Sequence, residues 1–169
     1  VAVCVRLKEL VACPLVDQFF LAERGYLGEM KFLPKRITVL ENKCSRSMVA
    51  KFPPREFRSY KRLLFTGTLA AHTGVFKAIE IARALYQLDS EITLTIIGYA
   101  AKPDVYQQLV TTIEPYPFIQ LLGGDALVPH EEIIKQIFKA DFGIVIYPYN
   151  PSTVNTTPTK LYEYLACQL

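Results

Sequence analysis

From Leu63 onward, short apolar runs alternate with longer stretches in which apolar residues recur every three or four positions. The short runs are nearly continuous and rich in Ile, Leu, Phe and Thr, as in strands that are covered on both faces. Strands are predicted at residues 63–66, 92–97, 118–122 and 142–147. Their regular alternation with helical patterns is typical of βαβ units. The sequence therefore predicts an α/β fold, namely a Rossmann-like parallel sheet with helices on both faces.

The stretches between these strands carry recognisable helix starts. Helices are predicted at residues 75–86, 103–113 and 131–138, and from residue 157 to the end of the chain. Pro103 suits a first helical position, because proline has no amide hydrogen to leave unpaired. Glu131 and Glu132 would lie in a first turn, where the helix dipole favours negative charge. In the last helix, Thr157 is the predicted cap and Pro158 the predicted first residue, and the sequence stops within that helix.

The first part of the chain has a different pattern. Residues 17–22 and 37–40 are predicted strands, with a helical stretch around residues 26–32 between them. Residues 42–60 are polar, basic and interrupted by Pro53 and Pro54, which favours an interdomain linker.

Composition limits the kind of protein that this chain can form. Its 169 residues, 51% of them hydrophobic, suffice for one substantial core but not for two complete nucleotide-binding domains. The sequence starts at Val1 rather than Met, and we treat it as a fragment. No apolar run approaches the roughly 20 residues that cross a bilayer. The four cysteines are widely spaced and form no CxxC pair, which argues against a zinc site and favours thiols in a reducing, cytoplasmic compartment.

Positive charge is concentrated in one segment. Ten basic and two acidic residues lie between Lys31 and Arg62, although the net charge of the chain is only +3. We interpret this segment as a solvated linker in preference to a membrane-surface patch, and nucleic acid is not an expected partner, because aromatic-interleaved recognition patterns are absent. Peripheral association with the inner face of a membrane stays an alternative.

The predicted fold indicates where a ligand would bind. In a doubly wound sheet, the ligand crevice opens where the strand order reverses, outside the carboxyl ends of the strands. Here that is between the first and fourth strands of the predicted sheet. The loops 67–74 and 148–158 follow these strands, and Gly98 and Tyr99 flank them.

The first loop, GTLAAHTG, has glycine at both ends. Gly67 and Gly74 let the backbone approach a ligand and present amides at a helix N-terminus, which suits phosphate. The loop is neither GxGxxG nor a Walker loop, and no acidic residue ends the second strand, which argues against an NAD enzyme. A structural turn without a ligand is the alternative.

The second loop precedes the last predicted helix. The amides of Thr159, Lys160 and Leu161 would be free at the start of that helix, and Lys160 adds positive charge for a diphosphate. Glu163 lies on the same helix face and would accept hydrogen bonds from a ribose diol. The alternative is a surface ion pair between Lys160 and Glu163.

The succession LLFTGTLAAHTGVFKAIEIARAL, LTIIGYA, ADFGIVIYP and TPTKLYEYLAC resembles the donor-binding C-terminal domain of GT-B glycosyltransferases, in particular the family-4-like group 1 enzymes. The upstream DQFFLAERGYL and ITVLENK resemble the end of the N-terminal domain. The resemblance implies an incomplete GT-B C-terminal domain at residues 62–169, a linker at 46–61 and a remnant of the N-terminal acceptor domain at 1–45.

The resemblance further implies transfer of a sugar from a nucleotide-diphosphate sugar to a glycan or lipid-linked glycan, with retention of configuration and without a metal ion. No cofactor other than the donor substrate is expected, catalytic residues are not assigned, and this fragment alone is expected to be inactive. The implied phosphate-binding residues are Gly67, Thr68, Thr73, Gly74, Thr159, Lys160 and Leu161. Glu163 and Asn155 are the implied ribose and sugar ligands. Gly98, Tyr99, Leu127 and Val128 are implied to line the base.

The sequence departs from the family pattern at several positions. Thr68 and Thr73 replace basic residues, Asn155 replaces a second glutamate, and Gln168 replaces a glycine. These differences keep two alternatives open: a non-catalytic GT-B-like module for binding or assembly, and a nucleotide-sugar epimerase of similar architecture. The incomplete sheet edge also makes a homodimer an alternative to a monomer.

Overall fold

The computed structural model describes residues 8, 10–28, 36–43, 60–149, 154 and 156–169. The chain divides into two compact units, one formed by residues 1–43 with 151–158 and the other by residues 44–150 with 159–169. Of the predicted linker, residues 46–61, only Tyr60 and Lys61 lie within the described residues.

The first unit contains a small parallel sheet. Strands β1 (Phe19–Leu21) and β2 (Ile37–Val39) pair in register, Phe19 opposite Ile37. Short 3-10 helices, η1 (Cys13–Leu15) and η2 (Arg24–Gly28), flank β1 in the sequence. Both predicted strands are confirmed. The helical stretch predicted at 26–32 is instead a 3-10 helix that ends at Gly28, and residues 29–35 lie outside the described residues.

The second unit has a parallel four-stranded sheet in the order β5-β4-β3-β6. Its strands are β3 (Arg62–Thr68), β4 (Thr93–Tyr99), β5 (Ile119–Gly124) and β6 (Phe142–Gly143). The first strand of this unit therefore lies between the second and the fourth, as the doubly wound pattern predicts.

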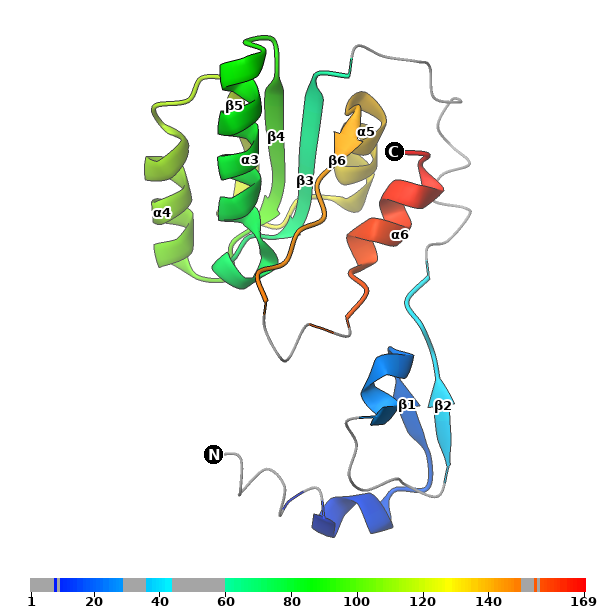
Figure 1. Cartoon of the computed structure of the whole chain (residues 1–169). Coiled ribbons are helices and arrows are strands. Elements are labelled where there is room, and N and C mark those ends of the chain that lie inside the picture. The colour runs from blue at the N-terminus through cyan, green and yellow to red at the C-terminus, as the bar shows by residue number, and fades with distance from the viewer. Residues whose placement is uncertain (1–7, 9, 29–35, 44–59, 150–153, 155) are drawn as a thin grey trace. The chain divides into compact units, whose positions relative to one another are not determined.

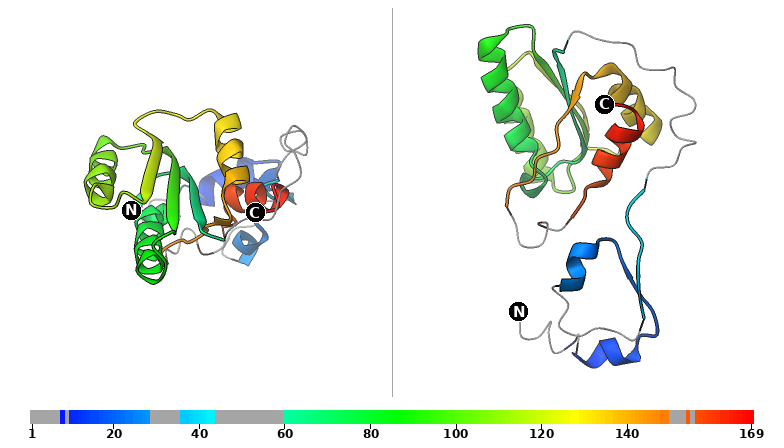
Figure 2. Two further views of the ribbon diagram at one scale, coloured as in Figure 1. Left: turned by 90° about the horizontal axis from the view of Figure 1, so that it is seen from above. Right: turned by 45° about the vertical axis from the view of Figure 1, so that its right-hand side comes forward.

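Helices cover both faces of this sheet, so the predicted α/β architecture is confirmed. They are α3 (Val75–Leu88), α4 (Pro103–Ile113), α5 (His130–Lys139) and α6 (Thr159–Ala166), with the short η3 (Ala71–Thr73) before α3. Figures 1 and 2 show α3 and α4 on one face and α5 and α6 on the other.

The core of the second unit follows the alternation of side chains along β3. Phe65 faces the core beneath α3 and α4, where Ile79 and Leu109 are buried. Leu64 points to the opposite face and packs in the core that contains Ile134 of α5. Because adjacent strand residues point to opposite faces, one continuous apolar strand supplies both cores.

Strand β6 is much shorter than predicted, because residues 144–147 are not in the ladder. The carbonyls of Arg62 and Leu64 accept hydrogen bonds from the β6 side. The next amide on that side of β3, that of Thr66, donates instead to the Tyr164 hydroxyl of α6, at 3.1 Å. Tyr164 is buried, which raises the pKa of its phenol above the ordinary value. A neutral side-chain hydroxyl therefore occupies the place of the next ladder partner.

Helix α6 ends in a completed cap and does not run on to the last residue. The amide of Leu169 donates to the carbonyl of Tyr164, and that of Gln168 to the carbonyl of Leu165. Gln168 has a φ of 58°, in the left-handed region. This pair of bonds forms a Schellman motif, in which glycine is the preferred residue at the left-handed position. The prediction that the chain stops within the helix is wrong.

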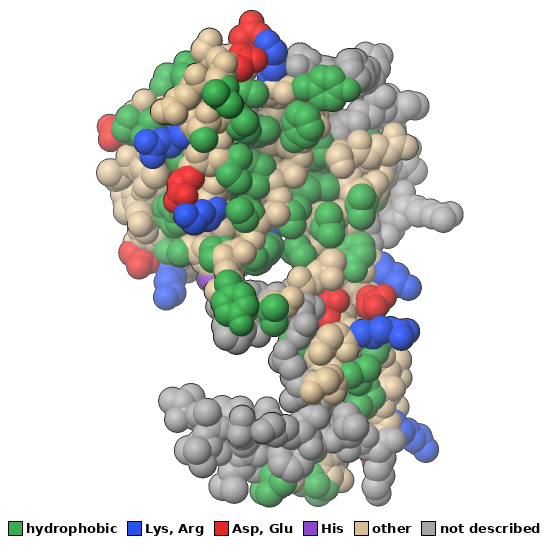
Figure 3. All heavy atoms as spheres, viewed as in Figure 1, with side chains coloured by type: hydrophobic (Ala, Val, Ile, Leu, Met, Phe, Trp, Pro, Cys, Tyr) green, Lys and Arg blue, Asp and Glu red, His purple; other side chains and the backbone are tan. Residues whose placement is uncertain are grey.

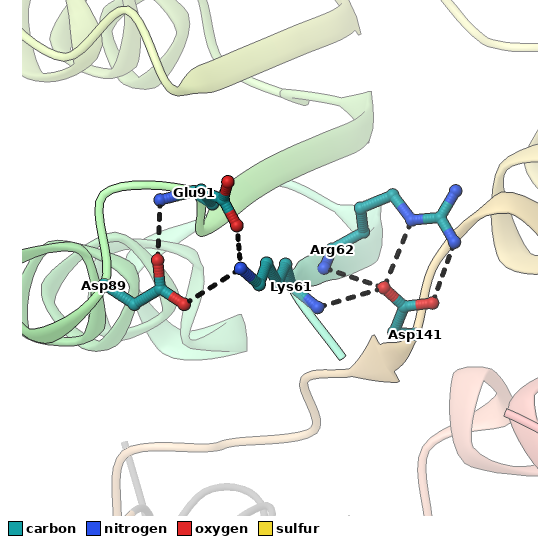
Figure 4. A network of polar contacts seen from close by, with 5 residues as sticks. All are labelled: Lys61, Arg62, Asp89, Glu91 and Asp141. Atoms are coloured by element: carbon teal, nitrogen blue, oxygen red, sulfur yellow. Dashed lines mark hydrogen bonds and ion pairs between the residues drawn. The ribbon is translucent and has the colours of Figure 1, made fainter. Parts of the chain in front are cut away.

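A network of charged groups joins the amino ends of three strands (Figure 4). Asp141, with its side chain 3% exposed, accepts hydrogen bonds from the Arg62 guanidinium and from the amides of Lys61 and Arg62. Burial would raise the pKa of the Asp141 carboxyl, but these hydrogen bonds and the nearby Arg62 charge outweigh it and lower that pKa below its usual value. Lys61 also pairs with Asp89 and Glu91 at the end of α3 and the start of β4.

The described surface carries charges of both signs. On the face seen in Figure 3, acidic and basic side chains lie beside one another at several places, with hydrophobic side chains between them. No helix among the described residues is long and apolar enough to cross a membrane. Within the same residues, no three His, Cys, Asp or Glu side chains are grouped as a metal site requires.

We expect Asp141→Asn to lower the free energy of unfolding by about 2 to 3 kcal/mol at pH 7, because a buried charged acceptor is lost. The pKa of Asp141 is lowered by folding, so its stabilisation is fully present above the unfolded value of about 3.9 and is lost as the pH falls through the folded value. Urea unfolding from pH 7 to pH 3 should show the difference shrinking below about pH 4. Asp89→Asn, at a more exposed pair, should cost less than about 1 kcal/mol. Equal losses for the two variants would contradict the prediction.

Gln168→Gly should stabilise the chain by about 0.5 to 1 kcal/mol, because glycine adopts the left-handed conformation without a Cβ penalty. The matched control is Gln168→Ala, which removes the same side chain but keeps the strained Cβ. Thermal unfolding of both variants measures the difference. A glycine variant no more stable than the alanine variant would show that the left-handed position costs nothing here.

Candidate functional site

The loop after β3 is stabilised by the side chain of Thr73, one of its own residues. The Thr73 hydroxyl lies 2.7 Å from the carbonyl of Thr68 and 2.8 Å from that of Ala70, which share its single hydrogen, and it accepts from the amide of Ala70 at 3.1 Å. Thr73 is only 8% exposed. The Thr73 hydroxyl therefore forms hydrogen bonds within the turn, whereas the resemblance implied that Thr73 contacts phosphate. Thr68, at the end of β3, is exposed.

The two glycines of this loop have positive φ values, 107° at Gly67 and 87° at Gly74. A Cβ at Gly74 would collide with the carbonyl of Ile146, which lies in the segment after β6. Gly74 is therefore required both for the left-handed turn that starts α3 and for the close approach of the second loop. The loops that follow β3 and β6 meet at this point.

Lys160 lies directly over the first of these glycines. A Cβ built on Gly67 would be 3.7 Å from Lys160 Cε and 4.0 Å from its Nζ. The ammonium group lies 3.6 Å from the centre of the Phe65 ring and 5.5 Å from that of Tyr147. Lys160 comes from the first turn of α6, so the predicted convergence of the two loops at one end of the sheet is confirmed.

Among the described residues, the Lys160 ammonium has no hydrogen-bond partner, although Lys160 is only 6% exposed. Burial lowers the pKa of Lys160 to about 8, and the negative charge of Glu163 only partly opposes this shift. The two rings supply cation-π attraction but cannot accept the three hydrogen bonds of an ammonium group. A buried cation without an acceptor is costly, so this group is suited to an incoming anion.

Glu163 is held by a residue that the sequence did not single out. Its Oε1 lies 2.9 Å from Nε2 of His130, the first residue of α5. The Glu163 side chain is 20% exposed. It thus lies beside Lys160 on α6 and is open to a ligand. Among the described contacts, Glu163 forms no ion pair with Lys160. The alternative of a surface ion pair between these two residues is therefore wrong.

The residues implied for base binding cluster at the carboxyl ends of β4 and β5. Gly98 faces the carbonyl of Gly67, so any Cβ there would clash with β3. The Tyr99 carbonyl accepts the amide of Leu69 at 2.8 Å. Val128 packs against Gly123, whereas Leu127 is 76% exposed. Of the two hydrophobic side chains, Leu127 is therefore the one available to a ligand, and Val128 supports the turn.

The predicted cap of the last helix is wrong. Helix α6 starts at Thr159, and Thr157 and Pro158 precede it. Within the first unit, the Glu23 carboxylate accepts the amide of Thr157 at 2.7 Å, and its second oxygen lies 3.3 Å from the Thr157 hydroxyl. Thr157 is therefore bound to Glu23 and is not the helix cap. Asn155 lies outside the described residues.

Sequence reasoning missed His130, Glu23 and the two aromatic rings beneath Lys160. His130 was hidden in a predicted helix start, where only the acidic residues gave a signal. Phe65 and Tyr147 lie in apolar runs that predict strands, and nothing in such a run indicates a cation above it. The contact of Glu23 with Thr157 joins residues 134 positions apart, which no local pattern reveals.

No model of a known protein family matches the sequence, and neither does any curated protein. Solved structures do resemble the fold. A mutant of TarM from S. aureus, in complex with fondaparinux, α-GlcNAc-glycerol and UDP, has a TM-score of 0.68 at 11% identity, over 92% of this chain and 29% of that chain. HepE from Anabaena, in complex with UDP and glucose, has a TM-score of 0.63 at 13% identity, over 96% of this chain and 45% of that one. AviGT4, a glycosyltransferase involved in avilamycin A biosynthesis, has a TM-score of 0.53 at 14% identity, over 88% and 44%.

These likenesses establish the fold. The chain has the fold of GT-B glycosyltransferases, and it spans less than half the length of these three solved chains.

We expect Lys160→Met to raise the free energy of unfolding at pH 7 by about 1 to 3 kcal/mol, because it removes a buried charge without an acceptor. Folding lowers the pKa of Lys160 to about 8, so the charged form is penalised in full below pH 8. Between pH 8 and the unfolded value of about 10.4, the unfolded state binds more protons, and wild-type stability rises relative to the variant. Denaturant unfolding at pH 7 and pH 9.5 measures both effects. A variant less stable than wild type at pH 7 would mean that the two rings fully compensate the charge.

Proposed function

We propose that the second unit binds the nucleotide-diphosphate part of a sugar donor, as part of a glycosyltransferase that transfers the sugar to a glycan or lipid-linked acceptor. The observation that carries this proposal is the buried Lys160 ammonium, which lies over Gly67 and has no hydrogen-bond acceptor in the part of the chain that the structure describes. A diphosphate would supply the missing acceptors. TarM and HepE, which share the fold, were both solved in complex with UDP.

The diphosphate would lie between the two loops that meet at Gly74. The free amides at the start of α6, from Thr159 to Leu161, provide donors next to Lys160, and the helix dipole adds positive potential. Gly67 has no side chain, so a ligand beside the Lys160 ammonium would be able to approach its backbone. Glu163, three residues after Lys160, would accept hydrogen bonds from the ribose, and Leu127 would cover the base.

In the proposed reaction, groups of the protein stabilise the negative charge of the leaving diphosphate. As the sugar leaves, negative charge grows on the diphosphate, and an ammonium group with oriented amides stabilises that charge without a metal ion. The proposed reaction proceeds with retention of configuration. The acceptor and the remaining catalytic groups would come from the rest of such an enzyme, so we propose that this chain alone binds the nucleotide and does not turn over.

A second candidate is a GT-B-like module that binds or assembles without catalysis. It is favoured by Thr68 and Thr73, which stand where the family pattern that the sequence resembles has basic residues, and by the Thr73 hydroxyl, which forms its hydrogen bonds within the loop. A site with a single buried cation would bind a diphosphate less strongly than one with three. The two functions are therefore distinguished by whether nucleotide binding requires Lys160.

Isothermal titration of the chain with UDP, GDP and UMP tests the donor site. We expect a nucleoside diphosphate to bind, the monophosphate to bind more weakly, and Lys160→Met to weaken diphosphate binding at least about tenfold, which corresponds to about 1.4 kcal/mol. The matched control is Lys135→Met, on α5, where the lysine is half exposed beside Glu132. Folded protein that binds no nucleoside diphosphate, or binds it equally after Lys160→Met, would contradict the proposal and favour the non-catalytic module.

A further inference from the structure

A polar contact joins α5 and α6, the two helices on one face of the sheet. Nε2 of His130, at the start of α5, lies 2.9 Å from Oε1 of Glu163 on α6. Because a carboxylate oxygen accepts hydrogen bonds, the ring Nε2 is the donor. The His130 side chain is 45% exposed and that of Glu163 is 20% exposed, so the contact is partly accessible to solvent.

The backbone holds His130 firmly. It follows Pro129, whose ring fixes the backbone φ before the helix. The Pro129 carbonyl accepts hydrogen bonds from the amides of Glu132 and Ile133, at 3.0 and 3.3 Å, and these bonds form the first turn of α5. Two residues earlier, Val128 packs against Gly123 at the end of β5. The imidazole therefore projects from a fixed point, whereas the longer Glu163 side chain has three rotatable bonds to restrain.

The contact uses only one carboxylate oxygen. Oε1 of Glu163 accepts from His130, and no described residue forms a hydrogen bond to Oε2. A ribose diol needs an acceptor whose direction is fixed, because a freely rotating carboxylate loses conformational entropy when it binds. A carboxylate fixed through one oxygen presents the other in a defined direction.

We propose that His130 is a positioning residue for ribose recognition: it holds Glu163 through Oε1 so that Oε2 faces the hydroxyls of the bound nucleotide. This inference rests on the proposed function and adds the residue that orders its sugar-binding acceptor. A helix-to-helix contact with no role in binding is the competing explanation, since an exposed pair of this kind contributes only about 0 to 1 kcal/mol to stability.

The test compares ligands that differ only in the ribose hydroxyls. UDP and 2′,3′-dideoxy-UDP are titrated into wild type, His130→Ala and His130→Gln, with Lys135→Ala on the same helix as control. His130→Ala should weaken UDP binding about three- to tenfold and leave dideoxy-UDP binding unchanged, because only UDP uses the ordered carboxylate. His130→Gln, whose amide nitrogen can donate to Oε1, should restore most of the UDP affinity.

The outcomes separate this inference from the function on which it rests. UDP binding that depends on Lys160 but is unaffected by His130→Ala overturns the role of His130 and leaves the donor site intact. Equal weakening of both ligands by His130→Ala also overturns it, because the histidine would then act on the shape of the site and not on the ribose contact. Wild-type protein that is folded and binds neither UDP nor GDP overturns the donor site and the inference together. Thermal unfolding of each variant confirms that the proteins compared are folded.

Discussion

The hydrogen bond between the Thr66 amide and the Tyr164 hydroxyl determines how the candidate site is assembled. Helix α6 has only eight residues, and a helix of that length is marginal unless tertiary contacts fix it. Tyr164 docks it against β3 with a buried ring and a satisfied hydroxyl. Lys160 lies one turn earlier on the same face, so docking Tyr164 forces the ammonium group into the space above Gly67. Glu163, the neighbour of Tyr164, is then turned toward α5. The placement of both charged residues follows from one buried contact.

The contact between Tyr164 and β3 requires glycine at position 143. Its missing side chain leaves the space that the Tyr164 ring occupies, since a Cβ at this position would collide with the ring. The same insertion explains why β6 ends at Gly143, because the Thr66 amide that would bond the next strand residue is already taken. The released segment passes close to Gly74 at Ile146, which brings the two loops together. A shortened edge strand, which costs ladder hydrogen bonds, thus creates the meeting point of the loops.

Most of the second unit could be predicted from the hydrophobic pattern, and the parts that could not depend on single long-range contacts. The strands, the helices and the strand order follow from alternating apolar runs, because burial on both faces of a sheet leaves a strong local signal. The end of β6 depends on Tyr164, and Thr157 is bound by Glu23 within the first unit; both partners are distant in the sequence. Of the candidate site, Gly67, Gly74 and Lys160 were found through position at the switch point. His130 was missed, because a histidine after proline is ordinary in a helix start and gains meaning only when Glu163 lies beside it.

The charge and burial of Lys160 indicate why a lysine occupies this position. At neutral pH a lysine with a pKa of about 8 is still mostly charged, yet it lies among Phe65, Tyr147 and backbone with no acceptor of its own. An apolar side chain of similar length would fill the same space without the desolvation cost, so packing alone does not account for a lysine. An anion that enters this space restores hydrogen bonds to the ammonium and favours its charged form, so binding and full protonation reinforce each other. On the proposed function, the desolvation cost that lowers stability would be offset by the hydrogen bonds of a bound diphosphate, and this coupling of stability to affinity would distinguish a binding residue from one that only packs.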